Sequence, residues 1–179
     1  MPTAYLLTGE PQSGKTTVIK QLIDRIGKER CGGFYTEEIR VHGMRQGFRL
    51  ITLEGEQKIL AHIKSSSPVR LGRYGVNVAC LESLGIPALI QTFQTKRLII
   101  LDEIGPMEIL SEPFKQTVVE ILRVGYPLLG TIALKTHPFL DWVKRQDSVS
   151  LHHVTRTNQN EIISMLTPLL YMIVANIPN

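Results

Sequence analysis

The chain has 179 residues, of which 43% are hydrophobic, and a formal net charge of +4. This composition is typical of a folded globular protein and excludes a largely disordered one. No run approaches the ~20 apolar residues of a membrane-spanning helix, so we expect no membrane contact and a cytoplasmic location. The length suits a single domain over residues 1–179, which we expect to be a monomer.

Cysteine and basic residues give little functional signal. Cys31 and Cys80 are too isolated for a zinc site or a disulfide framework, and we expect two buried thiols. The basic residues are spread along the chain, which makes a nucleic-acid partner a weak prediction. A basic stripe could still form from six residues, for which a solvated face is the alternative interpretation: Arg40, Arg45, Arg49, Lys64, Arg70 and Arg73.

The first predicted elements flank a phosphate-binding motif. Residues 4–8 are an apolar run typical of a buried strand, and residues 15–26 place apolar side chains on one helical face that ends at Gly27. Between them lies the pattern G-x-x-x-x-G-K-[ST], here Gly9-Glu10-Pro11-Gln12-Ser13-Gly14-Lys15-Thr16. In such a loop the amides surround the β-phosphate, Lys15 reaches the β and γ oxygens, and the Thr16 hydroxyl ligates Mg2+. The motif predicts a nucleoside triphosphate as ligand; a glycine-rich turn without ligand is the alternative.

Strand and helix patterns alternate along most of the remaining chain. Further strands are predicted at residues 33–39, 97–102, 128–134 and 148–154, and further helices at 78–93, 114–123, 139–146 and 161–171. We expect Pro87 to break the helix over 78–93 or to start a turn within it. This alternation predicts an α/β fold with a mainly parallel sheet, flanked by helices, that binds its ligand at the carboxyl ends of the strands.

Residues 33–62 depart from the alternation and read as extended chain. Gly43 and Gly47 bracket a first turn and Glu54-Gly55-Glu56 a second, so we expect an antiparallel β-meander at one edge of the sheet. Residues 63–77, which are rich in serine and glycine, are then predicted to be a long, mobile loop.

Two acids follow the apolar residues 98–101, as in a Walker B strand. We expect Asp102 to hold Mg2+ together with Thr16, and Glu103 to polarise the attacking water. Nucleotide kinases usually lack such a glutamate, because their acceptor is a second substrate. The pair therefore favours hydrolysis over plain surface charge.

Lys135 follows the fourth core strand, at the edge where a γ-phosphate would lie. It is either a catalytic cation, equivalent to an arginine finger supplied in cis, or a solvated lysine. Thr131 or Thr136 could equally be the polar sensor there.

Several other polar residues each allow two interpretations. Glu37, Glu38 and Glu108 either order the waters of Mg2+ or are surface carboxylates, which is the simpler assumption. Tyr74 either stacks on a base or anchors its loop in the core. The adjacent His152 and His153 of a predicted strand face opposite ways and cannot chelate one metal together.

Five segments combine into a family resemblance: 8–17, 33–38, 47–49, 74–78 and 101–108, the last reading Leu-Asp-Glu-Ile-Gly-Pro-Met-Glu. They resemble the thermophilic nucleoside-triphosphatase family, whose animal member is called cancer-related nucleoside-triphosphatase. The resemblance implies a RecA-like P-loop NTPase sheet with core strand order 5-1-4-3-2. It also implies slow, Mg2+-dependent hydrolysis of ATP, GTP, CTP, UTP and TTP.

The resemblance further implies which residues contact the nucleotide. They form two groups: Gly9, Glu10, Pro11, Gln12, Ser13, Gly14, Lys15, Thr16 and Thr17, then Leu98, Ile99, Ile100, Leu101, Asp102, Glu103, Ile104 and Gly105. Members of the family have an Asn-Arg pair before the last helix, where this chain has Asn158-Gln159. Arg156 is the candidate substitute for that arginine.

The sequence therefore predicts a nucleoside-triphosphate phosphohydrolase of low base specificity, since no guanine-reading N-K-x-D motif occurs. Two rivals stay open. A small nucleotide or nucleoside kinase would need an arginine-rich lid, for which only Arg70 and Arg73 are available. A nucleotide-dependent adapter for RNA or a protein would hydrolyse almost nothing without its partner.

Overall fold

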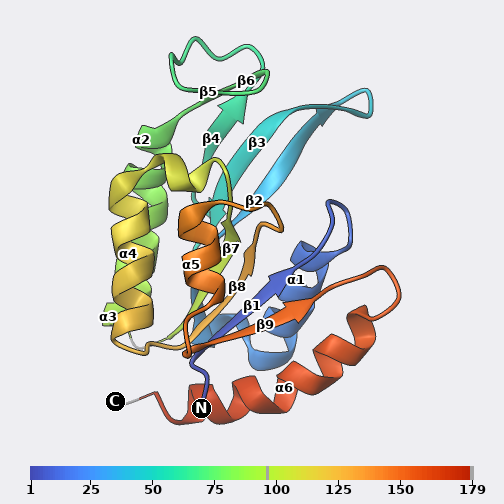
Figure 1. Ribbon diagram of the computed structural model, residues 1–179, viewed down its shortest axis with the longest axis vertical. Coiled ribbons are helices and arrows are strands. Elements are labelled where there is room, and N and C mark those ends of the chain that lie inside the picture. The colour runs from blue at the N-terminus through green and yellow to red at the C-terminus, as the bar shows by residue number, and fades with distance from the viewer. Residues whose placement is uncertain (96, 178–179) are drawn as a thin grey trace.

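The computed structural model describes residues 1–95 and 97–177, so residues 96, 178 and 179 of the predicted domain lie outside the described part. A single mixed sheet with helices on both faces makes up the fold (Figure 1). The strands are β1 (Ala4–Thr8), β2 (Cys31–Val41), β3 (Met44–Thr52), β4 (Gln57–His62), β5 (Arg70–Leu71), β6 (Tyr74–Val76), β7 (Leu98–Ile104), β8 (Leu128–Ile132) and β9 (Val149–His153). The α-helices are α1 (Lys15–Ile26), α2 (Val78–Cys80), α3 (Ile86–Gln94), α4 (Glu112–Arg123), α5 (Pro138–Lys144) and α6 (Gln159–Ala175).

Over residues 1–95 and 97–177, the sheet has nine strands in the order β5-β6-β4-β3-β2-β7-β8-β1-β9. Its parallel part is β2-β7-β8-β1-β9, because each of these neighbours pairs in parallel. Counted along the chain, these strands have the order 5-1-4-3-2, which confirms the expected core order. The strand that carries the two acids, β7, is separated from the loop strand β1 by β8.

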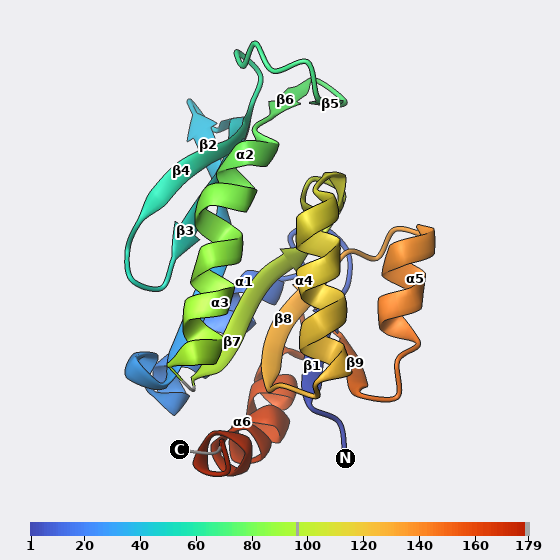
Figure 2. The same ribbon diagram turned by 90° about the vertical axis from the view of Figure 1, so that its left-hand side faces the viewer.

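Helices cover both faces of the parallel strands (Figures 1 and 2). Along β1, Leu6 packs into the core beneath α3, α4 and α5, whereas Leu7 packs into the core beneath α1 and α6. The same alternation holds in β7, where Ile99 and Ile100 point to opposite cores. Strands buried on both faces read as uninterrupted apolar runs, which is why the sequence marked them so clearly.

Helix α1 begins directly after the phosphate loop and ends at Gly27. Its buried residues are those of the predicted apolar face: Val18, Ile19, Leu22, Ile23 and Ile26. The last helix, α6, packs against α1, with Ile162, Leu166 and Leu170 buried. Its start at Gln159 and end at Ala175 are wider than predicted, and Pro168 lies inside it.

The meander at the sheet edge is confirmed, with one turn misplaced. Strands β2 and β3 are joined by His42 and Gly43, both at positive φ, as a two-residue hairpin requires. Gly47 does not bracket that turn; it lies inside β3, where a Cβ would stand 2.2 Å from the carbonyl oxygen of Ala61. This close approach, beside a register shift between Phe48 and Arg49, explains a glycine within a strand.

Residues 63–77 are not a loop throughout, so that prediction was wrong in extent. Strands β5 and β6 form a short hairpin here, and β6 pairs antiparallel with β4. Two or three residues are too few for an alternating pattern to show. Pro87 likewise breaks nothing, because a π-helical turn over Leu81–Gly85 precedes it and the helical segment continues through α3.

Candidate active site

The phosphate loop joins the carboxyl end of β1 to the first turn of α1. Gly9 and Gly14 have φ of 148° and 96°, and Gln12 also has positive φ, so the backbone turns tightly here. A Cβ on Gly9 would lie 2.3 Å from the carbonyl oxygen of Val154, which only glycine avoids. Lys15 lies back over the loop, where its Nζ donates to the carbonyl oxygens of Gly9 (2.9 Å) and Glu10 (3.0 Å).

Asp102 is held at the end of β7 by two hydroxyl groups. Thr16 of α1 donates to its Oδ2 at 2.7 Å, and Thr131 of the neighbouring strand β8 donates to its Oδ1 at 2.5 Å. The carboxyl group is buried, and burial raises its pKa despite these two hydrogen bonds. The structure thus brings together Thr16 and Asp102, the two predicted metal ligands, and places Thr131 beside them.

A bulge re-aims the chain directly after Asp102. Leu101 pairs with Gly130 and Ile104 with Ile132, so β7 has an extra residue relative to β8 at this point. Glu103 lies at this bulge within β7 and lines the same large cavity as Lys15 and Thr16. Burial, and next the charge of Asp102, raise the pKa of Glu103 to about 7. A group with this pKa can take up a proton near neutral pH.

Glu108 is buried, contrary to the expectation of a surface carboxylate. Its side chain is 5% exposed and lies on the turn that follows β7. A Cβ on Gly105 would lie 2.5 Å from Glu103 Oε1 and 3.0 Å from Glu108 Oε2, so both carboxyl groups close around this glycine. Burial, and next the charge of Glu103, raise the pKa of Glu108 to about 8. The sequence signal was the Gly105-Pro106 turn, which folds the second acid back towards the first.

The large cavity has a volume of about 1110 Å3 and lies at the carboxyl edge of the sheet. The phosphate loop, α1 and the segment after β8 form one end of it, and the meander forms the other. Lys135 and Thr136 line it; both side chains are exposed. The role of Lys135 as a catalytic cation stays a prediction.

Residues Leu98, Ile99, Ile100 and Leu101 are fully buried in the sheet. They belong to the two cores rather than to the cavity wall. Their place in the structure is to carry Asp102 and Glu103 to the edge of the sheet. Glu103 is the residue of the predicted segment 98–105 that lines the cavity.

Comparison with known proteins identifies the family. The protein-family model described as NTPase matches residues 4–167. The chain belongs to this NTPase family. The protein is an enzyme of the nucleoside-triphosphatase class. The family resemblance found in the sequence is thereby confirmed.

Similar proteins cover nearly the whole length of the chain. The nucleoside-triphosphatase THEP1 of Thermotoga sp. (strain RQ2) is 41% identical over 165 residues, which span 92% of this chain and 94% of that protein. The cancer-related nucleoside-triphosphatase homolog of Mus musculus is 35% identical and matches 91% of this chain and 94% of its own length. The crystal structure of THEP1 from Aquifex aeolicus superposes with a TM-score of 0.85 at 36% identity, covering 93% of this chain and 98% of that one.

The segment in which this NTPase differs from the expected family pattern lies against the phosphate loop. Gln159 Nε2 donates to the carbonyl oxygen of Ser13 at 2.7 Å, and its amide lies over Gly14. Asn158 closes the preceding turn by accepting from the Thr155 N–H at 2.8 Å. Arg156 lines a second, smaller hollow of about 250 Å3 on this side of the loop. Its role as a substitute arginine stays a prediction.

The remaining candidate residues have structural partners. Tyr74 is 8% exposed and packs edge-on against Phe48 with ring centroids 5.4 Å apart, which makes it an anchor of the β5–β6 hairpin. Glu37 pairs with Lys20 at 2.6 Å, and Glu38 pairs with both Arg40 and Arg45. Glu37 and Glu38 lie within β2, because this strand runs on to Val41, two residues beyond the predicted end at residue 39.

Other sequence expectations are answered more briefly. Cys31 and Cys80 are buried free thiols, as predicted. His152 stacks on Tyr5, while His153 is exposed. Across residues 1–95 and 97–177, no three His, Cys, Asp or Glu side chains gather as a metal cluster. None of the helices in the described part of the chain combines the length and hydropathy that a membrane crossing requires.

Proposed function

We propose that the protein hydrolyses ATP, GTP, CTP, UTP and TTP to the diphosphate and phosphate, with Mg2+, low base specificity and slow turnover. The observation that carries the proposal is the meeting of three elements at one cavity. The Thr16 hydroxyl bonds Asp102 at 2.7 Å, and Glu103, the next residue, lines the cavity together with the phosphate loop.

The residues present fit a magnesium ion. Mg2+ prefers oxygen ligands and is held in such sites by a few protein oxygens together with substrate phosphates. Thr16 and Asp102 supply a hydroxyl and a carboxylate at one place, and the burial of Asp102 makes its negative charge costly unless a cation is near. Bound there, Mg2+ would neutralise charge on the phosphate oxygens.

The protein's own groups divide the remaining work. The loop amides and the N-terminus of α1 bind the phosphates, and Lys15 exchanges its two carbonyl partners for phosphate oxygens. Glu103 holds the attacking water and accepts its proton at the carboxylate. Lys135 adds positive charge at the rim, and because its side chain is exposed to solvent, water screens that charge, which favours slow turnover.

The hollow beside Thr155 and Arg156 is small, so it offers a base few side chains to contact. This is consistent with low base specificity. The two arginines that a nucleotide-kinase lid would need are engaged in hydrogen bonds within the protein. Arg70 donates to the carbonyl oxygen of Arg73 at 2.7 Å, and Arg73 donates to that of Arg45 at 2.7 Å, so both hold the hairpin together.

Phosphate release from each of the five triphosphates, with Mg2+ and with EDTA, tests the proposal. We expect all five to be hydrolysed with kcat/KM values within about tenfold of one another, because recognition is directed at the triphosphate. EDTA should abolish release. A preference of about a hundredfold for one base would contradict the low specificity, and full activity in EDTA would contradict the assigned magnesium site.

A further inference from the structure

A side chain at the start of α6 bonds the phosphate loop. Gln159 Nε2 donates to the carbonyl oxygen of Ser13 at 2.7 Å, although the two residues are 146 positions apart in the chain. The amide also covers Gly14, where a Cβ would lie 2.2 Å from Nε2. Of the described residues that line the large cavity, Gly14 is one and Gln159 is not. Gln159 therefore contacts the loop without contacting the space in which the phosphates would lie.

This hydrogen bond sets the orientation of one peptide group of the loop. The bond between Ser13 and Gly14 is trans, so its carbonyl oxygen and its N–H point in opposite directions. With the carbonyl oxygen fixed on Gln159, the Gly14 N–H is turned towards the inside of the loop. Inward-pointing amides are the groups that bind the β-phosphate in a loop of this kind. The Ser13 N–H is already used, because it donates to the carbonyl oxygen of Glu10 at 3.2 Å.

The start of α6 is itself fixed in place. Asn158 Oδ1 accepts from the Thr155 N–H at 2.8 Å, and Asn158 Nδ2 donates to the carbonyl oxygen of His153 at 2.9 Å. The Val154 N–H donates to the carbonyl oxygen of Thr8 at 2.7 Å, which ties this segment to the strand that leads into the phosphate loop. Helix α6 then packs against α1. The amide that bonds Ser13 is thus carried by a well-supported part of the fold.

Lys15 also bonds carbonyl oxygens of the loop, but its charge has a second task. Its Nζ donates to the carbonyl oxygens of Gly9 and Glu10, and the proposed function requires it to exchange them for phosphate oxygens. The amide of Gln159 is uncharged and lies away from the cavity lining, so its bond to Ser13 is retained when a nucleotide enters. A contact that persists through binding organises the loop in advance and lowers the cost of ordering it.

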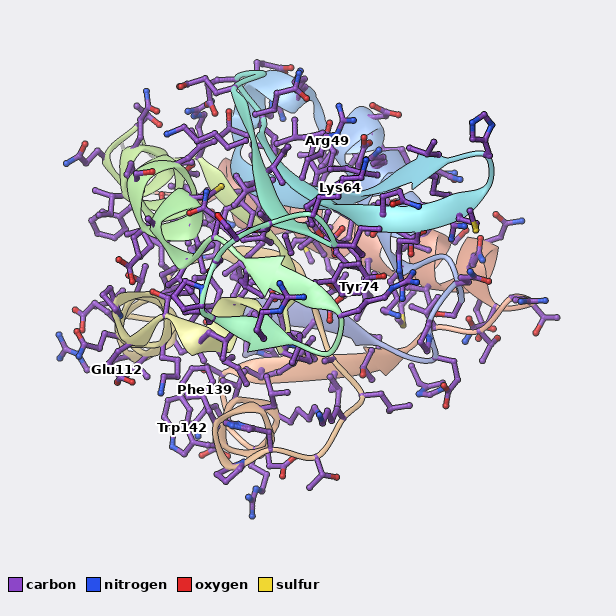
Figure 3. The ribbon with its side chains drawn as sticks, turned by 90° about the horizontal axis from the view of Figure 1, so that it is seen from above. Arg49, Lys64, Tyr74, Glu112, Phe139 and Trp142 are labelled. Atoms are coloured by element: carbon purple, nitrogen blue, oxygen red, sulfur yellow. The ribbon has the colours of Figure 1, made fainter. Side chains whose placement is uncertain are left out.

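The bond from Gln159 acts at one end of the large cavity. Leu71 of the β5–β6 hairpin lines the other end, and Figure 3 looks onto this hairpin, beside which Tyr74 is labelled. A substitution of Gln159 therefore tests phosphate binding separately from the meander and the hairpin.

We propose that Gln159 is a positioning residue for the β-phosphate: its side-chain amide holds the Ser13 carbonyl and thereby presents the Gly14 N–H to that phosphate. The inference rests on the proposed function, since it places the nucleotide in this loop. The β-phosphate is bound both before and during the reaction. Loss of one well-placed amide should therefore weaken the binding of diphosphate and triphosphate together and leave the chemical step nearly unchanged.

A matched pair of substitutions of similar shape tests this role. Gln159→Met keeps the length of the side chain and removes the donor, and Asn160→Leu makes the equivalent change at the next residue, whose side chain is exposed. Calorimetric titration gives the Kd of Mg2+–ADP, and phosphate release gives KM and kcat for ATP. In Gln159→Met we expect Kd and KM to rise about tenfold, with kcat within about threefold of the parent. Asn160→Leu should keep the parent's values.

A second variant and a second readout address the donor and the Gly14 amide directly. Gln159→Glu keeps the shape and replaces the donor by an acceptor, so it should weaken ADP binding at least as much as Gln159→Met. In protein labelled with 15N-glycine and saturated with Mg2+–ADP, the Gly14 N–H should exchange with solvent at least about tenfold faster in Gln159→Met than in the parent.

The results that would overturn the inference are specific. They are an unchanged ADP affinity in Gln159→Met, an equal loss in Asn160→Leu, or a fall in kcat at unchanged affinity. A lower stability of Gln159→Met in urea, with parental ADP affinity, would leave Gln159 only a structural role and would also overturn it. A parent that hydrolyses ATP while Gln159→Met binds ADP as the parent does leaves the proposed function standing. A parent that releases no phosphate contradicts the proposed function itself.

Discussion

The parallel core and the antiparallel edge of this sheet have different structural roles. Strands β1, β7 and β8 are buried on both faces, and their carboxyl ends carry the phosphate loop, Asp102 and Thr131 to one place. Strands β3 and β4 expose more of their side chains, and Arg45 of β3 pairs with Glu38 of the neighbouring strand β2. The core brings the proposed catalytic residues together, and the edge lines the part of the cavity in front of them.

The difference teaches where each kind of substitution should act. A change at a strand end of the core should alter nucleotide binding or turnover, because Glu103 lines the cavity and hydrogen bonds join Thr131 to Asp102 and Asp102 to Thr16 of the first turn of α1. A change at the edge should alter the stability of the meander and hairpin, with a smaller effect on phosphate chemistry. A substitution at the edge that altered turnover without altering stability would contradict this division of roles.

The largest effect is expected for Lys15→Ala. In the proposed mechanism one ammonium group binds the ground-state phosphates and stabilises charge in the transition state, so affinity and turnover should each fall by about 10^2-fold or more. Calorimetric titration with ATP and phosphate release measure the two effects. The matched control is Lys20→Ala, on the same helix as Lys15, which removes the ion pair between Lys20 and Glu37 of β2. It should change affinity and turnover far less. Unchanged ATP binding by Lys15→Ala would refute the assignment.

Glu108→Gln should change how stability depends on pH. The pKa of about 8 in the folded protein lies above the ordinary value of 4.5, so the folded state keeps a proton that the unfolded state has lost. This stabilising contribution is fully present below pH 4.5 and is lost as the pH rises towards 8. Urea unfolding at pH 5 and pH 8 should show a smaller loss of stability in Glu108→Gln than in the parent. Glu112→Gln, at an exposed carboxylate, should keep the parent's dependence; the same loss in both variants would contradict the assignment.

Tyr74→Phe should have the smallest effect. It keeps the ring against Phe48 and removes the hydroxyl that accepts from Arg45 (3.0 Å) and Arg73 (3.1 Å). We expect a loss of about 1 kcal/mol in the free energy of unfolding, with little change in kcat for ATP. A fall in kcat without a loss of stability would mean that the hairpin takes part in the chemistry.

The sequence was most informative where a local pattern is enough to determine structure. The run 98–101, the apolar face of α1 and the phosphate loop each specify an element and its place relative to the ligand. The parallel core order followed from the family resemblance. Both metal-ligand candidates are brought together, because parallel strands deliver their carboxyl ends to one edge.

The sequence was least informative where structure depends on distant partners. The β5–β6 hairpin is held by contacts from Arg73 to β3, which no local pattern encodes. The burial of Glu108 depends on how the chain turns at Gly105, and the contact of Gln159 with Ser13 joins residues far apart in the chain. Pro87 is tolerated because a π-helical turn precedes it, and this too is a property of packing rather than of composition.

The central claim is that Glu103, at the end of the core strand β7, acts on the attacking water and not on nucleotide binding. The most direct measurement is a comparison of Glu103→Gln with the parent in Mg2+–ATP affinity and in phosphate release at pH 8, above the pKa of about 7. The account predicts affinity within about tenfold of the parent and turnover lower by about 10^2-fold or more, the range that general-base catalysis supplies. Turnover within about threefold of the parent, in a preparation whose Lys15→Ala counterpart is inactive, would contradict it.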